Sequence, residues 1–413
     1  MRVLLNATDG PLSVRAVRRY VTEMVTGLGS PTSGIDLHVA FFTHRRKMVR
    51  HFLSSLPEDV TVTPHLFRLP RRVLNERHRR SRWELRRLAR QVDLYHETTI
   101  DSPDFDELPV VATIHGLCPV VAPGLLGAEF AADKTAAYRR TVDRSGYFAP
   151  VSETTRGEFL EHFPVSPSRV RAIPLGVSSE FRPRCDEETM PLLASMGIDL
   201  PYLLYVGGIQ PNKNIPQVLR TFARLKREGV FEGSLVLAGD QHYSEEEFES
   251  LLDIEGLLDA IDTAPDVILP GFFSPDDPRL AALYSSAKLF LFPSLYEGWT
   301  SPPLEAMASG VPVIASSCSS IPETVGDAAV TVDPQDSNAW VMAATELLTI
   351  PSRHDALREA GLSHAAQFPW SRTISRTIGF YEDVITGKLD EFDPVSAARA
   401  AIDTPQPDSD RSH

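Results

Sequence analysis

Two glutamates eight positions apart, Glu297 and Glu305, are the side chains of this sequence best suited to chemistry on a bound ligand. The first follows the hydrophobic run 289–292, and the second lies in a segment with Ser301 as a candidate N-cap and Pro302 at the first helical position. The N-terminus of such a helix leaves backbone N–H groups unpaired and attracts a phosphate. A carboxylate beside an anion site suits sugar hydroxyls, so the pair predicts a ligand that joins a phosphate to a sugar.

The elements around the two glutamates are predicted to form a strand, a loop, a short helix and a second strand. Gly310 is placed to end the helix, and the apolar run 311–315 predicts the next buried strand. This is a parallel βαβ unit, the kind that binds ligands at the carboxyl ends of its strands. On the residues alone, the two glutamates could instead cap or solvate the loop, because their spacing is common.

The whole stretch, FLFPSLYEGWTSPPLEAMASGVPVIAS at 290–316, resembles the donor-binding signature of family 4 retaining glycosyltransferases, which have the GT-B fold. The resemblance implies that Glu305 binds the nucleotide ribose and that Glu297 faces the donor sugar as a catalytic residue. It also implies donor contacts from the residues between them, Gly298, Trp299, Thr300 and Ser301. Relatives commonly carry Phe-Gly-Leu at the last three of these positions, so we expect a sugar pocket of different shape here.

A second constellation, YVGGIQPNKN at 205–214, ends a predicted strand and precedes a helix start. Lys213 stands where a cation would complete the neutralisation of a diphosphate at that helix N-terminus. Relatives carry a basic residue here that binds the donor pyrophosphate, which implies the same catalytic role for Lys213, with Gly207 and Gly208 beside the donor. Some relatives place an arginine where this chain has Gly208. The competing interpretation is a surface lysine near a turn.

His115 ends the predicted strand 110–114, at the edge where open α/β sheets bind ligands. The resemblance implies that His115 contacts the donor sugar near the reacting carbon, although a lone histidine can equally be structural. His96 resembles a second family position that faces the cleft. Asp104 and Asp106 match the Asp-x-Asp pattern of metal-dependent transferases, but they lie in a Pro-rich loop. We therefore predict no catalytic metal and no cofactor.

Composition excludes several classes of protein. The 413 residues carry a formal net charge of −14, which argues against a nucleic-acid binder. The sequence has no apolar run of about 18 residues that would predict a membrane-spanning helix. The first residues, MRVLLNATDG, predict a strand rather than a signal peptide. Three scattered cysteines suit a reducing compartment, so we expect a cytoplasmic protein.

Positive charge is concentrated in residues 68–90, which are dominated by arginine. Trp83, Leu85 and Leu88 alternate with the arginines. One interpretation is a solvated helix whose apolar residues pack in the core. The other is a basic amphipathic surface that brings the protein to an anionic membrane or an anionic acceptor.

Strand and helix patterns alternate along both halves of the chain, which indicates α/β domains. The predicted strands are Val3–Asn6, Leu37–Phe42, Leu94–His96, Val110–Ile114, Tyr147–Val151, Leu203–Val206, Ser234–Ala238, Val267–Leu269, Leu289–Phe292, Val311–Ala315 and Ala329–Val332. Predicted helices of the first half are 14–28, 74–91 and 131–144. With the resemblance, this predicts a GT-B fold of two tandem Rossmann-like domains. The expected boundaries are 1–178 for the acceptor domain, 179–367 for the donor domain, 368–388 for a crossover helix and 389–413 for a disordered tail.

The resemblance implies a retaining, metal-independent hexosyltransferase that moves a hexose from a nucleotide diphosphate sugar to a hydroxyl of a glycan, glycolipid or other acceptor. GDP-mannose is the expected donor, because PNKN after YVGG looks like bacterial mannosyltransferases of polysaccharide assembly. One alternative is a soluble natural-product glycosyltransferase that uses a UDP- or dTDP-sugar. Another is a non-catalytic GT-B subunit that binds glycan or partners an active transferase. The loss of a family glycine-rich loop at 13–20 favours this last alternative, whereas Lys213, Glu297 and Glu305 argue against it.

Overall fold

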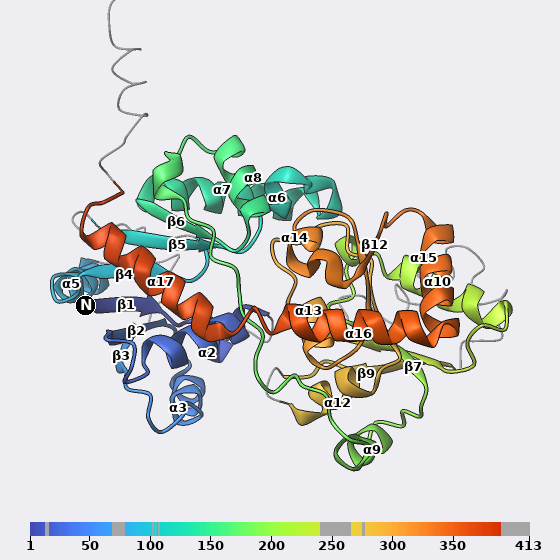
Figure 1. Cartoon of the computed structure of the whole chain (residues 1–413). Helices are drawn as coiled ribbons and strands as arrows, with labels where there is room; N and C mark the ends of the chain where they lie inside the picture. Colours follow the sequence, from blue (N-terminus) through green and yellow to red (C-terminus); the bar gives the residue numbers. More distant parts are fainter. Residues whose placement is uncertain are drawn as a thin grey trace, which may run out of the picture.

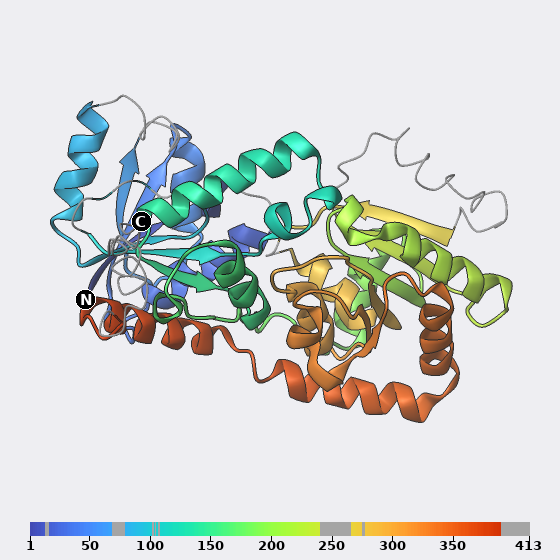
Figure 2. The ribbon, with the colours of Figure 1, turned by 90° about the horizontal axis from the view of Figure 1, so that it is seen from above.

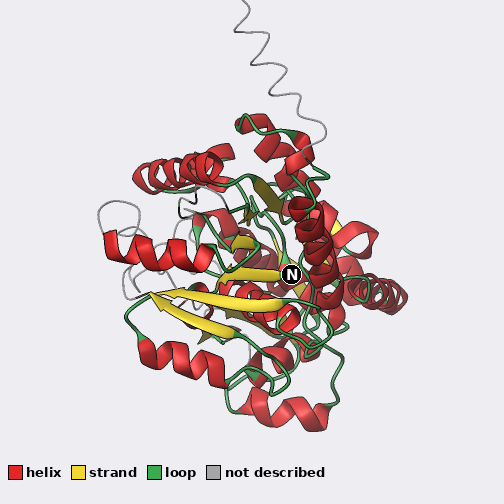
Figure 3. Cartoon of the chain, turned by 90° about the vertical axis from the view of Figure 1, so that its left-hand side faces the viewer, coloured by secondary structure: helices red, strands yellow, loops and turns green. Residues whose placement is uncertain are grey.

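The computed structural model describes residues 1–12, 16–67, 79–100, 103, 105, 108–239, 266–274 and 277–389 (Figure 1). These residues form two lobes, each built on a six-stranded parallel sheet. Seen from the side of the first lobe, the strands lie between helices (Figure 3). The predicted α/β fold of two tandem Rossmann-like units is confirmed. The predictions for Asp104, Asp106, the tail beyond 389 and part of the arginine-rich segment concern residues outside the described ranges.

The first lobe is a doubly wound sheet in the order β3-β2-β1-β4-β5-β6. Its strands are β1 (Arg2–Asn6), β2 (Asp36–Phe42), β3 (Thr63–Phe67), β4 (Leu94–Glu97), β5 (Val110–Ile114) and β6 (Tyr147–Pro150). Its helices are α1 (Asp9–Leu12), α2 (Ala16–Leu28), α3 (Arg46–Ser54), α5 (Arg79–Ala89), α6 (Cys118–Val121), α7 (Ala128–Arg144) and α8 (Glu153–His162). The strand order reverses between β1 and β4, which is where such sheets bind ligands.

The second lobe repeats the plan in the order β12-β11-β10-β7-β8-β9. Its strands are β7 (Tyr202–Val206), β8 (Ser234–Ala238), β9 (Val267–Gly271), β10 (Leu289–Phe292), β11 (Val313–Ser316) and β12 (Val330–Val332). Its helices are α9 (Asp186–Ala194), α10 (Ile215–Arg227), α12 (Pro278–Ser286), α13 (Ser301–Ala308), α14 (Ile321–Val325), α15 (Ser337–Thr349) and α16 (Pro351–Ala365). Short 3₁₀ turns occur in both lobes, at Pro123–Leu125, Pro167–Arg169, Pro211–Lys213 and Gly326–Ala328. Strands β7, β8, β10 and β11 are mostly buried, as expected for a parallel sheet covered on both faces.

The last described helix, α17 (Trp370–Ile385), returns to the first lobe. Figure 2 shows it lying along that lobe, whereas α16 lies along the second. Ile374, Phe380 and Tyr381 are buried in the same core cluster as residues of β1 and α2. The second lobe is therefore one continuous segment between two parts of the first.

The chain passes between the lobes twice, once near Val177 and once near Phe368. These two crossings lie side by side. The Val177 N–H donates to the Phe368 carbonyl at 2.8 Å. Gly176 permits this approach, because a Cβ at that position would lie 2.6 Å from the Trp370 Cα. The two crossings thus form a single hydrogen-bonded hinge.

The described part of the arginine-rich segment is helix α5. Leu85 and Leu88 on it are buried and pack with Phe42 and Phe67. These two leucines are therefore core residues and do not form an apolar face for lipid. Within the described ranges, no helix is long and apolar enough to cross a membrane.

Candidate active site between the two lobes

A cavity of about 390 Å³ lies between the lobes, within the range of small-molecule and cofactor sites. The first lobe contributes Val17, Arg19, Tyr20, His115 and Val151 to its lining. The second lobe contributes Gly207, Gly208, Gln210, Lys213, Glu297, Gly298, Trp299, Ser301 and Glu305. Every residue predicted to bind the donor or to act in catalysis lines it except Thr300, which is fully buried beside it. His96, which the sequence placed facing the cleft, does not line it.

Helix α13 begins one residue earlier than the sequence predicts. Thr300, rather than Ser301, is the N-cap residue, and it makes no side-chain capping bond. Pro302 and Pro303 carry no N–H, so Ser301 and the preceding loop must supply the backbone donors at this helix end. Gly310 ends the helix with φ of +78°, as expected. This N-terminus therefore offers a phosphate fewer donors than an ordinary helix would.

Two buried polar atoms beside the helix start have no hydrogen-bond partner among the described residues. They are the Trp299 Nε1 and the Thr300 Oγ1. Buried polar groups in native proteins are nearly always paired, and an unpaired one calls for an explanation. Trp299 lines the pocket, so a ligand hydroxyl or phosphate oxygen is a suitable partner for its N–H.

Lys213 and Glu297 form an ion pair, with 2.5 Å between the lysine Nζ and the carboxylate Oε1. Hydroxyls of Ser319 and Ser320 fix the Glu297 backbone, since both donate to its carbonyl at 2.6 and 2.9 Å. Asn214 occupies the N-cap position of α10, but its amide donates to the Pro334 carbonyl at 3.0 Å instead of capping the helix. The Asn214 side chain therefore does not cap α10.

Glu305 is paired with a residue that the sequence did not single out. The Arg19 Nη1 donates to the Glu305 Oε1 at 2.8 Å, and the Arg19 Nη2 lies 3.1 Å from the Glu180 Oε1. Arg19 belongs to α2 of the first lobe and Glu305 to α13 of the second. This ion pair thus spans the cleft.

His115 lines the pocket from the end of β5. Its Nε2 lies 2.8 Å from the Thr98 carbonyl, which can only accept, so the Nε2 carries a proton. Burial lowers the pKa of His115 below its ordinary value. At neutral pH we therefore expect a neutral ring whose other nitrogen accepts hydrogen bonds.

His96 does not face the cleft. It is 1% exposed, its Nε2 lies 2.7 Å from the Thr113 Oγ1, and its Nδ1 is hydrogen-bonded to the Tyr381 hydroxyl. Burial, and then the charge of nearby His115, lowers the pKa of His96 to about 3. His96 is thus a structural residue that joins β4 and β5 to α17.

One end of the pocket is walled by groups suited to a nucleobase. Phe272 lines it and is 43% exposed, and the neighbouring Phe273 is buried. Gly239 lines the pocket as well, and a Cβ there would lie 1.8 Å from the Gly207 carbonyl oxygen. The sequence signal for Phe272 was an aromatic residue shortly after a predicted strand.

Two Rossmann-like lobes in tandem, a pocket where their strand ends face each other and a helix that returns to the first lobe define the GT-B architecture. Two family models match the chain: "Glycosyltransferase Family 4" over residues 17–181 and "Glycosyl transferases group 1" over residues 200–349. Together the two segments cover well over half of the sequence. The chain belongs to glycosyltransferase family 4, and the protein is a glycosyltransferase.

Bacterial mannosyltransferases are among the similar proteins. The O-antigen chain mannosyltransferase B of Escherichia coli is 29% identical over 308 residues, which is 74% of this chain and 77% of that protein. The MMP alpha-(1->4)-mannosyltransferase of Mycolicibacterium hassiacum is 31% identical over 240 residues, 57% of this chain and 53% of that protein. HepE of Anabaena, solved with UDP and glucose, superposes with a TM-score of 0.68 at 13% identity, covering 92% of this chain and 98% of HepE. This last likeness shows the fold.

Proposed function

We propose that this glycosyltransferase moves mannose from GDP-mannose to a hydroxyl of a glycan or glycolipid, with retention of configuration. The observation that carries the proposal is the convergence of Lys213, Glu297, Glu305 and His115 on one pocket between the lobes. The cation Lys213 suits a diphosphate, and the Glu305 carboxylate suits a ribose. The Glu297 carboxylate and the neutral His115 suit a hexose.

Charge separation is the main demand of this reaction. As the bond between the sugar C1 and the diphosphate breaks, negative charge grows on the leaving oxygen and positive charge on C1. Lys213 would exchange Glu297 for a diphosphate oxygen, which frees that carboxylate for the sugar hydroxyls. The acceptor oxygen then bonds to C1 from the same face and passes its proton to the departing diphosphate. Neutral His115, oriented by Thr98, would hold the sugar near C1.

Mannose is supported by the names of relatives, and GDP-mannose as its donor form by this chain's PNKN motif. Both curated relatives described above are mannosyltransferases. A UDP-sugar is the second candidate, because HepE was solved with UDP and glucose. We further propose that the acceptor is a hydroxyl of a glycan or of a lipid-linked glycan, and that residues 68–90 contact an anionic membrane at the cytoplasmic face.

Nucleoside diphosphate release from GDP-, UDP-, ADP- and dTDP-sugars, with a metal chelator present, tests the proposal. We expect release from GDP-mannose, a fall of at least about tenfold in Glu305→Gln, and an α-anomeric product by NMR. Release that requires a divalent metal would overturn metal independence. No nucleoside diphosphate release from any donor, together with no nucleotide binding by calorimetry, would favour the non-catalytic alternative.

A further inference from the structure

Arg19 is a pocket residue that the proposed reaction does not yet use. Its side chain is 10% exposed and contacts Glu305 on α13 and Glu180 on the chain crossing. Its guanidinium carbon also lies 4.7 Å from the centre of the Phe181 ring. One side chain thus joins three segments: α2 of the first lobe, the crossing, and α13 of the second lobe.

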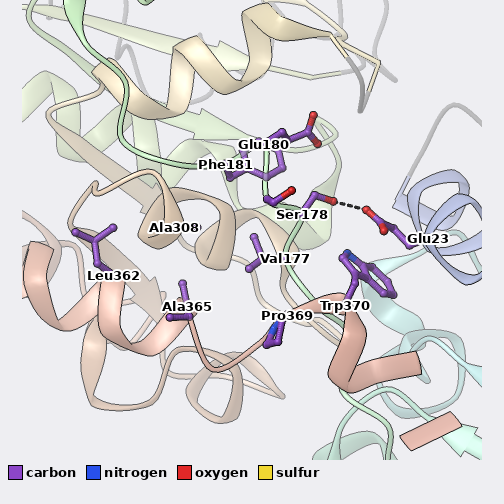
Figure 4. A pocket seen from close by; sticks show the side chains of 12 residues that line it. Glu23, Val177, Ser178, Glu180, Phe181, Ala308, Leu362, Ala365, Pro369 and Trp370 are labelled. Carbon is purple, nitrogen blue, oxygen red and sulfur yellow. Dashed lines mark hydrogen bonds between the residues drawn. The ribbon is translucent and has the colours of Figure 1, made fainter. Parts of the chain in front are cut away.

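The same face of α2 contacts the crossing a second time. Glu23, one helical turn beyond Arg19, accepts a hydrogen bond from the Ser178 hydroxyl at 2.5 Å (Figure 4). Figure 4 also shows Glu180 and Phe181 on this crossing, beside a second cavity of about 610 Å³. Trp370, from the other crossing, lines both this cavity and the donor pocket. Arg19 therefore lies where the hinge meets the site.

A buried carboxylate needs a compensating charge to stay ionised and fixed in orientation. The Glu305 side chain is 9% exposed, and the Arg19 guanidinium supplies that charge. The planar guanidinium donates in fixed directions, so it sets the carboxylate's orientation as well as its charge. Because Arg19 comes from the opposite lobe, Glu305 is held this way only when the lobes are in this arrangement.

We propose that Arg19 is a positioning residue that orients Glu305 toward the donor ribose and so couples ribose recognition to closure of the two lobes. The inference rests on the proposed function, because it takes Glu305 as the ribose ligand. It adds a residue of the acceptor-side lobe to the specificity of the donor site.

The test compares donor kinetics with the ribonucleotide and the 2′-deoxyribonucleotide form of the accepted donor. In Arg19→Ala we expect the KM to rise about tenfold and the preference for the ribo form to shrink by a similar factor. Arg19→Lys should recover part of the KM but not the preference, because lysine is a point charge. Glu23→Gln, the matched change on the same helix face, should alter both by less than about twofold.

Coupling is measured with the double variant. If Arg19 acts through Glu305, then the KM and the ribo preference of Arg19→Ala/Glu305→Gln should be no worse than those of Glu305→Gln alone. A merely structural Arg19 would raise the KM and leave the ribo preference intact, and its losses would add to those of Glu305→Gln; that result overturns the inference. Thermal unfolding of each variant identifies one that fails to fold, in which case Arg19→Lys decides. A wild-type protein that binds no nucleotide overturns the proposed function and this inference with it.

Discussion

At the residue scale, the pocket is organised as two ion pairs, Lys213 with Glu297 and Arg19 with Glu305. All four side chains are less than a fifth exposed, so each charge is balanced by its partner where water is scarce. A donor diphosphate adds negative charge to this balanced set. Donor binding is therefore an exchange of ionic partners, and Lys213 is the cation placed to make it.

Removing the cation should be costly for the chemical step. For Lys213→Ala we expect the rate of nucleoside diphosphate release to fall by about 100- to 1,000-fold, the usual loss when a preorganised charge stabiliser is removed. Single-turnover measurement separates this step from binding. Lys288→Ala removes an exposed lysine of the same lobe and should leave the rate unchanged. A Lys213→Ala rate close to that of wild type would refute the diphosphate role.

Phe272 should contribute to affinity for the base rather than to the rate. Stacking of a base on an aromatic ring is worth on the order of 1–3 kcal/mol, so Phe272→Ala should weaken GDP binding about tenfold or more. Isothermal calorimetry measures this directly. Phe272→Tyr retains the ring and should bind GDP normally. The control Phe130→Ala removes an aromatic that is 52% exposed on α7 and should also bind GDP normally. Equal affinity of Phe272→Ala and wild type would place the base elsewhere.

The sequence predicted Glu297, Glu305 and Lys213 because each stands beside a strand end and a helix start, which are local signals. Arg19 carried no such signal. It is one of several arginines near the start of its helix, and its partner Glu305 is 286 positions away. Pairing across two lobes depends on how they pack, and one sequence does not encode that in any local pattern.

At the element scale, α13 and β3 show what local patterns can and cannot predict. The two prolines and Gly310 gave α13 its ends to within one residue. Strand β3 was not predicted, because Pro64 interrupts it and its residues are mostly exposed. Among the strands that the structure describes it pairs only with β2, and an edge strand tolerates proline. Buried elements with strong end signals were thus predictable, and the edge strand was not.

The burial of His96 between the sheet and α17 should make stability depend on pH. The pKa of His96 is about 3 in the fold and about 6.5 in an unfolded chain, so between these values the unfolded state binds more protons. The free energy of unfolding should therefore decrease as pH falls below about 6.5, by up to about 1.4 kcal/mol per pH unit from this group.

Urea unfolding of wild type and His96→Gln at about pH 7 and about pH 5 measures the effect. The loss on acidification should be about 2 kcal/mol larger in wild type, because only wild type must keep this buried ring neutral. His115, whose pKa is also lowered by burial, contributes to both proteins and cancels in the comparison. Equal losses of unfolding free energy in the two proteins would contradict the lowered pKa of His96.

At the scale of the whole molecule, the lobes are held together by contacts around the loop 293–300, which carries Glu297. The Glu323 carboxylate of α14 accepts from the Glu153 and Thr154 N–H groups at 2.7 and 2.8 Å, at the N-terminus of α8 in the other lobe. The Tyr296 hydroxyl donates to Glu158 at 2.5 Å, and burial raises the pKa of that carboxyl. This role of Glu323 becomes visible once both lobes are placed.

At Gly298 the backbones of the two lobes come close together. A Cβ there would lie 2.0 Å from the His115 carbonyl oxygen, so in Gly298→Ala the backbone at this contact must shift, and we expect the lobes to move apart. We expect turnover to fall more than about tenfold, with a larger radius of gyration by small-angle X-ray scattering. Gly379→Ala on α17, where a Cβ meets nothing within 4 Å, is the control. An unchanged radius in Gly298→Ala would show that the loops yield instead of the lobes.

The return of α17 to the first lobe also sets the order in which the protein can fold during synthesis. Domains usually fold as they leave the ribosome, the N-terminal one first. Here Ile374, Phe380 and Tyr381 belong to the core of the first lobe but are made after the whole second lobe. The second lobe, continuous in sequence, can complete its core while the first still exposes the apolar face that α17 will cover. The lobe that is made first is therefore the lobe that is finished last.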